Sequence, residues 1–86
     1  MENRIALIGI IVEDLEAAPA VSAVLHEFAR HVVGRMGIPC PERHLSIISV
    51  VIDAPADVIN ALGGRLGRIP GISVKSQMAR LRREEA

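Results

Sequence analysis

Two runs of residues that are apolar on both faces of a strand constrain this fold most. Residues 4–12 read RIALIGIIV and residues 45–53 read LSIISVVID, and both are of strand length and rich in β-branched side chains. Side chains alternate between the two faces of a strand, so a sheet with one wet face should alternate apolar and polar residues. The first run sorts into Ile5, Leu7 and Ile11 against Ala6, Ile8, Ile10 and Val12, and the second into Leu45, Ile47 and Val51 against Ile48, Val50 and Ile52. Both faces of these two strands therefore need a cover.

The segment after the first run has helical spacing. Apolar residues recur at i, i+3, i+4, i+7 and i+11 from Val21 to Val32. Pro19 is tolerated only in the first turn of a helix, which favours a helix that starts within 16–18 and ends near Arg30.

A second helix and two further strands complete the set. Asp53 can cap a helix that has Pro55 in its first turn, and Gly67 can end that helix. Strands are predicted over 31–38, where two glycines disfavour a helix, and over 72–78, where residues alternate between two faces.

The order strand, helix, strand, strand, helix, strand gives a ferredoxin-like α+β fold when its crossovers are right-handed. We expect an open-faced sandwich in which two helices cover one face of a four-stranded antiparallel sheet, with the first and third strands central. A chain of 86 residues has room for one core, so we expect a single domain over 1–79 and a charged tail over 80–86.

The second apolar face predicts an oligomer. Burying a Val, Ile or Leu side chain contributes about 1.5–3 kcal/mol, so a wet apolar face would forgo a sizeable part of a total stability of about 5–15 kcal/mol. A second copy related by two-fold symmetry is the simplest cover. We expect a homodimer or a dimer of dimers, with an interface at Ile8, Ile10, Ile48 and Val50. The alternative is a groove for a large apolar ligand on a monomer.

Charge balance and cysteine content limit the partners and the location. Ten basic residues offset ten acidic ones, so no overall positive field attracts a phosphate backbone, and direct nucleic-acid binding is not expected. Cys40 is the only cysteine and cannot form an internal disulfide, and the segment before the first predicted strand is too short for a signal peptide or a membrane span. A cytoplasmic protein is the expectation.

Four residues are candidates for ligand binding. Glu13 and Asp14 lie where the first strand meets the first helix, a position that often contacts ligands, although two acids there can also serve only to start the helix. Arg35 lies between glycines that let a ligand approach, and its guanidinium can pair with a carboxylate or phosphate. Met36 follows it. The alternative for this segment is an edge strand that its charge and glycines protect from aggregation.

Metal binding and catalysis have weaker support. Cys40 and His44 place a thiol and an imidazole four residues apart, but a soft-metal site needs three or four converging ligands. His26 and His31 are five apart and would lie on different faces of a helix. No orienting carboxylate accompanies the thiol and imidazole pair, so we expect no enzyme, and no cofactor is indicated. The glycines at 63–64 favour tight packing of the second helix on the sheet.

Four segments of the chain resemble the iron-only hydrogenase system regulator family. They read RIALIGIIVED at 4–14, VGRMGIP at 33–39, SIISVVIDAP at 46–55 and LGRIPGISVK at 66–75, and they span nearly the whole chain. GRMGIP combined with SVVIDAP at this spacing is the most specific part. Members of this family are small proteins assigned as transcriptional regulators associated with hydrogenase maturation genes.

The resemblance implies a dimeric ACT-like domain similar to the C-terminal regulatory domain of the nickel-responsive repressor. That repressor carries a DNA-binding arm ahead of the domain, whereas the first strand predicted here begins at Arg4, so DNA contact is expected to need a partner protein. The repressor's nickel-binding histidines align with Met36 and Ile38 and its cysteine with His44, so nickel sensing is not expected.

Together these features predict a regulatory module that responds to a small ligand or a protein partner. The response would be a shift of subunit packing, with the ligand binding one arrangement better than the other. The alternative is an assembly factor that docks another protein without a small ligand.

Overall fold

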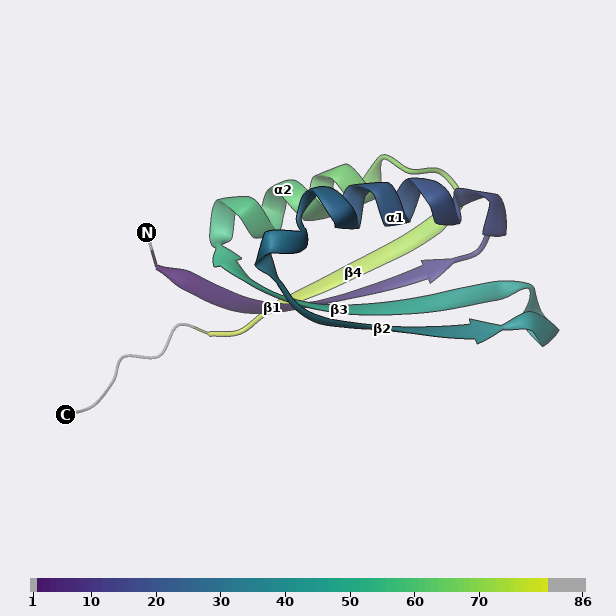
Figure 1. The fold of residues 1–86 in the computed structure, drawn as a ribbon, viewed down its shortest axis with the longest axis horizontal. Helices are drawn as coiled ribbons and strands as arrows, with labels where there is room; N and C mark the ends of the chain where they lie inside the picture. Colours follow the sequence, from purple (N-terminus) through teal and green to yellow (C-terminus); the bar gives the residue numbers. More distant parts are fainter. Residues whose placement is uncertain (1, 81–86) are drawn as a thin grey trace.

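The strands form one antiparallel sheet in the order β2-β3-β1-β4 (Figure 1). The structure is a computed structural model that describes residues 2–80. In chain order its elements are β1 (Asn3–Val12), η1 (Leu15–Ala17), α1 (Ala18–Glu27), η2 (Ala29–His31), β2 (Val32–Cys40), η3 (Pro41–Arg43), β3 (Leu45–Pro55), α2 (Ala56–Gly67) and β4 (Ile72–Met78), where η marks a short 3-10 helix. This is the predicted ferredoxin-like α+β arrangement, and β4 spans the predicted residues.

β1 and β3 are the central strands, as predicted. β1 pairs with β3 along its whole length, from Asn3 opposite Pro55 to Val12 opposite Ser46. The other side of β1 pairs with β4, and the outer side of β3 pairs with β2. β2 and β4 are therefore the two edges of the sheet.

Both helices lie on the same face of the sheet, and the core fills the space between helices and strands (Figure 1). Each helix contributes three buried residues, Val21, Val24 and Leu25 from α1 and Ile59, Leu62 and Leu66 from α2. β1 and β3 contribute alternate residues, which are Ala6, Ile8, Ile10, Val12, Ile48, Val50, Ile52 and Ala54. Aliphatic side chains of this kind interdigitate closely without polar partners.

The face beneath the helices is the one on which the dimer interface was predicted, and that prediction is wrong. Ile8, Ile10 and Val50 have 0% of their surface exposed, and Ile48 has 9%. The fold of the single chain already covers them, so a second copy cannot reach them. Alternation along a strand sorts its residues into two sets, but the handedness of the crossovers decides which set the helices cover.

Three boundaries differ from the predicted ones. β3 continues to Pro55 because it pairs there with the start of β1, so Asp53 lies inside the strand and does not cap α2, which begins at Ala56. β2 likewise continues beyond its predicted end to Cys40, paired with the start of β3. α1 ends at Glu27, and η2 then carries the chain to β2. Pairing between strands, which local patterns do not report, extends β2 and β3.

The turn predicted at Pro70 and Gly71 fastens the start of β4 to the end of β1. The backbone N–H groups of Glu13 and Asp14 both donate to the Gly71 carbonyl oxygen, each at 2.9 Å. Gly71 has a φ of 85°, and a Cβ there would lie 2.6 Å from the Cβ of Asp14. Both the backbone conformation and the available space therefore require glycine at this position.

The glycines of α2 have no such role. A Cβ added at Gly63 or Gly64 would meet no atom within 4 Å, so the predicted tight packing of these residues on the sheet is wrong. Glycine inside a helix costs conformational entropy, and no close approach by another of the described residues offsets that cost.

Within residues 2–80, no helix is long and apolar enough to cross a membrane. Of the charged tail predicted over 80–86, the structure describes Arg80 as exposed, and residues 81–86 lie outside the described residues. The division of the chain at residue 79 stays a prediction.

Candidate functional site

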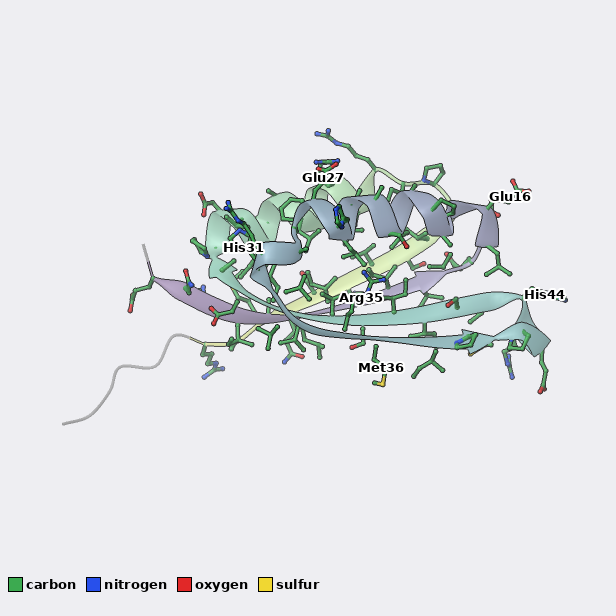
Figure 2. The ribbon with its side chains drawn as sticks, viewed as in Figure 1. Glu16, Glu27, His31, Arg35, Met36 and His44 are labelled. Carbon is green, nitrogen blue, oxygen red and sulfur yellow. The ribbon has the colours of Figure 1, made fainter. Side chains whose placement is uncertain are left out.

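The sheet face opposite the helices is apolar, and none of residues 2–80 forms a layer over it. Seven of the exposed or half-buried side chains on this face define what we call the open face: Ile5, Leu7 and Ile11 on β1, Met36 and Ile38 on β2, and Ile47 and Val51 on β3. Those on β1 and β2 are between 41% and 59% exposed. Figure 2 shows Met36 pointing away from the helices. Contiguous apolar patches of this kind mark interaction surfaces.

The register between strands arranges the open face in three rows, with Ile5 lying beyond them opposite Asp53. In each row a residue of β2 lies opposite one of β3, then one of β1, then one of β4. The rows are Gly34, Val51, Leu7 and Gln77; Met36, Ser49, Gly9 and Lys75; and Ile38, Ile47, Ile11 and Ser73. The part of the face on β2, β3 and β1 is thus mainly apolar, and β4 gives it one polar rim.

A hollow lies over β1 and β4, across the middle row and the row of Leu7. Its volume is about 380 Å³, and it is lined by Leu7, Gly9, Ser49, Lys75, Ser76 and Gln77. Gly9 and Ser49 lie directly opposite each other on the two central strands, and the missing side chain of one and the short side chain of the other leave this space. The sequence patterns singled out neither residue, although a glycine inside a strand signals the close approach of another group.

Glu13 and Asp14 hold the end of β1 in place. Ser73 Oγ donates to Glu13 Oε1 at 2.9 Å, which ties the strand to β4. Asp14 Oδ1 accepts from the backbone N–H of Glu16 at 3.0 Å and so caps η1. Asp14 therefore starts a helical turn, which is the structural role that the sequence analysis gave as the alternative to ligand binding.

Arg35 lines a groove between α1 and β2. The groove has a volume of about 690 Å³ and is lined by Pro19, Ser22, Ala23, Leu25, His26, Ala29, Val32 and Arg35. Figure 2 shows Arg35 pointing toward α1, on the opposite side of the sheet from Met36. Within the part of the chain that the structure describes, no carboxylate forms an ion pair with Arg35. The groove therefore contains one guanidinium and one imidazole.

The structure does not bring the four ligand candidates into one site. Glu13 and Asp14 lie at the end of β1 beside β4, Arg35 lines the groove, and Met36 lies on the open face. Arg35 and Met36 lie on opposite faces of the sheet because neighbouring residues along a strand point to opposite faces.

Cys40 and His44 flank the turn between β2 and β3. Cys40 is half-buried at the end of β2, and His44 has a left-handed backbone with a φ of 57°. His26 lies in the groove and His31 ends η2, at the opposite end of β2 from this turn. Among residues 2–80, no group of three or more His, Cys, Asp or Glu side chains could hold a metal ion. Within that range, no further ligand joins Cys40 and His44.

An ion pair on the solvent side joins the two helices. Arg65 of α2 donates to both carboxylate oxygens of Glu27 of α1, at 2.7 and 3.0 Å. This hydrogen bonding lowers the pKa of the Glu27 carboxyl and raises the pKa of Arg65. The pair supports the packing of α1 on α2 and lies away from the open face.

Comparisons with known proteins relate the chain to one family. A family model named TM1266-like, described as "Iron-only hydrogenase system regulator, putative", matches residues 4–76. A search of curated proteins finds no match. Among solved structures, TM1266 from Thermotoga maritima, described as uncharacterized, is 36% identical with a TM-score of 0.87, and the match covers 92% of this chain and 100% of that chain.

Two more distant structures share only the fold. An unknown protein from Galdieria sulphuraria is 15% identical with a TM-score of 0.62, over 95% of this chain and 48% of its own. A formyltetrahydrofolate deformylase from Pseudomonas putida KT2440 is 16% identical with a TM-score of 0.56, over 86% of this chain and 28% of its own. The family match, in contrast, covers most of the chain, and the Thermotoga protein is similar over its full length. The chain therefore belongs to the TM1266-like family of iron-only hydrogenase system regulators, which its four sequence segments predicted.

Proposed function

We propose that this chain is a regulatory homodimer of an iron-only hydrogenase system and that two copies join through their open faces. The open face carries the proposal, because it leaves seven aliphatic side chains uncovered by either helix. Membership of the family supports the regulatory role. A dimer of dimers remains compatible with this contact.

Covering the open face supplies a free energy of the same order as the cost of association. Full burial of an aliphatic side chain contributes about 1.5–3 kcal/mol, so covering one that is about half exposed contributes about 1 kcal/mol. Two sets of seven side chains then supply on the order of 10 kcal/mol. Association costs about 4–15 kcal/mol, so a dimer is stable only when most of the open face is covered.

The proposed role needs no reaction catalysed by the chain.

Direct contact with DNA is not part of the proposed role. Ten basic residues offset ten acidic ones, which leaves no overall positive field for DNA. An effect on transcription would then pass through a partner protein that contacts DNA.

β2 connects a candidate ligand site to the proposed dimer face. Arg35 lines the groove beside α1, and the next residue, Met36, lies on the open face (Figure 2). β2 pairs with β3 only, and glycines at 34 and 37 flank these two residues. An anion that binds Arg35 better in one subunit arrangement than in another would shift the balance between them. The proposed effector is therefore a small carboxylate or phosphate.

The dimer is tested by molar mass in solution, measured by sedimentation equilibrium. Leu7→Glu should produce a monomer, because it places a carboxylate in a buried apolar contact. Leu15→Glu is the matched control: Leu15 is 50% exposed against 46% for Leu7, but it lies in η1, away from the open face. It should stay dimeric. A monomeric wild-type protein at micromolar concentration, or a Leu7→Glu variant as dimeric as the wild type, would refute the proposal.

Ligand sensing is tested by thermal unfolding with phosphate and a panel of small carboxylates. A ligand at about 100 times its Kd adds about 2.7 kcal/mol to stability and raises Tm. Arg35→Ala should abolish this rise, whereas Arg68→Ala, which removes an exposed arginine outside the groove, should keep it. No rise with any anion, or a rise that survives Arg35→Ala, rejects this effector site. A monomer without any ligand response would favour the assembly factor.

A further inference from the structure

Gly9 has no explanation within the single chain. It lies in the central strand β1, where glycine weakens a strand because it adds no packing and costs conformational entropy. Its φ is not left-handed, and a Cβ there would meet only the carbonyl oxygen of Lys75, at an ordinary 3.9 Å. Alanine would therefore fit. What glycine provides at this position is the hollow on the open face.

The rows of the open face place large and small residues on opposite sides of β3. In the middle row, Met36 on β2 is the large residue and Gly9 on β1 is the small one. In the next row the order is reversed, with Gly34 on β2 and Leu7 on β1. A Cβ at Gly34 would meet nothing within 4 Å, so this glycine also leaves open space. The third row has isoleucine on both strands.

The centre of the apolar surface lies on β3. β2 and β1 flank β3 on its two sides, and β4 carries the polar rim beyond β1. An interface between identical surfaces has its two-fold axis at the centre of the shared patch. Neighbouring strands are about 4.8 Å apart, so β1 and β2 are equally far from β3. A two-fold axis along β3 therefore sets β1 of one copy opposite β2 of the other.

We infer that two copies pack about this axis, so that each row faces the same row of the other copy. The second copy's Met36 then fills the hollow above Gly9, and its Leu7 lies over Gly34. Aligned sheets pack about 10 Å apart with interdigitating side chains, so a large residue on one sheet needs a small one opposite. The inference rests on the proposed homodimer and adds which residues meet in it.

Other residues of the middle row suit this arrangement. Met36 is 59% exposed, and its unbranched thioether side chain adapts to an irregular gap (Figure 2). Ser49 lies on the axis and faces its own copy, and a hydroxyl can both donate to and accept from an identical hydroxyl. Lys75 lies on β4 at the edge of the hollow, so its aliphatic stem flanks the second copy's Met36 while its ammonium group extends into water.

The contact is tested by filling the hollow and then removing the residue that should occupy it. Gly9→Leu should raise the dimer Kd by about tenfold or more, because it overpacks the space that the second copy's Met36 takes. Adding Met36→Ala to Gly9→Leu should bring the Kd back to within about threefold of that of Met36→Ala alone. Circular dichroism confirms that each variant is folded.

The outcomes separate this inference from the proposed homodimer. If Gly9→Leu weakens the dimer and Met36→Ala does not restore it, or if Gly9→Leu has no effect, the packing is wrong although the dimer stands. A monomeric wild-type protein overturns both.

Cross-linking gives a second measurement that does not depend on overpacking. In a Cys40→Ser background, Ser49→Cys places one thiol on the axis facing its own copy, and an added mild oxidant should link two copies rapidly through a disulfide. Lys75→Cys is the control on the rim and should react slowly. Faster linkage through Lys75→Cys than through Ser49→Cys would show that the axis does not follow β3.

Discussion

Replacing Gly71 by alanine should destabilise the protein by about 2–4 kcal/mol. An L-residue in the left-handed region costs about 1–2 kcal/mol, and Gly71 has a φ of 85°. The new Cβ would also lie 2.6 Å from the Cβ of Asp14, so the turn and the end of β1 must move apart. That movement weakens two backbone hydrogen bonds of 2.9 Å, from Glu13 and Asp14 to the Gly71 carbonyl, each worth about 0.5–1.5 kcal/mol net.

Urea denaturation measures the effect, at one fixed protein concentration because dimerisation would add to the apparent stability. Gly64→Ala is the matched control, since its Cβ would meet nothing within 4 Å on α2 and should stabilise the protein by about 0.5–1 kcal/mol. The two glycine substitutions should therefore shift the midpoint in opposite directions. A loss below about 0.5 kcal/mol for Gly71→Ala would refute the reasoning, because it is smaller than the backbone cost alone.

Three further predictions concern the core, the helix pair and the cap of η1. Leu62→Ala should cost about 2–5 kcal/mol in urea denaturation, because Leu62 is 0% exposed and its removal leaves a cavity. Glu27 has a lowered folded-state pKa, so its contribution to stability is present above the ordinary value of 4.5 and is lost as pH falls through the folded value. Glu27→Gln should therefore lose less stability than the wild type when the pH falls below 4.5, as urea denaturation at several pH values would show. High salt should reduce this difference between variant and wild type. Asp14→Ala should cost about 0.5–2 kcal/mol through loss of the η1 cap and leave any anion-induced rise in Tm unchanged.

The order of elements and the central pair of strands were predictable because both depend on local patterns. Side-chain period distinguishes strand from helix, and the order of elements with right-handed crossovers leaves few topologies. β4 is an example, because the alternation of its side chains over Ile72–Met78 correctly predicted both ends of the strand. The start of α2 was not predictable in this way. Asp53 and Pro55 match the local pattern of a helix start, but pairing with β1 extends β3 through both residues.

The candidate site was only partly predictable. That an apolar surface would remain on β1 and β3 followed from their composition, but the four interface residues lay on the wrong face. Glu13 and Asp14 were ligand candidates with a helix start as the alternative, and their bonds to Gly71, Ser73 and Glu16 were not predicted. Contacts between residues some sixty positions apart leave no trace in local spacing.

The amino-acid order thus established two things: which residues share a face of each strand, and that one chain has more apolar strand surface than two helices can cover. Both follow from the fixed period of the extended backbone. Folding in three dimensions decided which face the helices cover and which residues become neighbours across strands. Those outcomes depend on crossover handedness and strand register, which are properties of the assembled sheet. The large and small residues of the open face acquire their complementary arrangement only at that level.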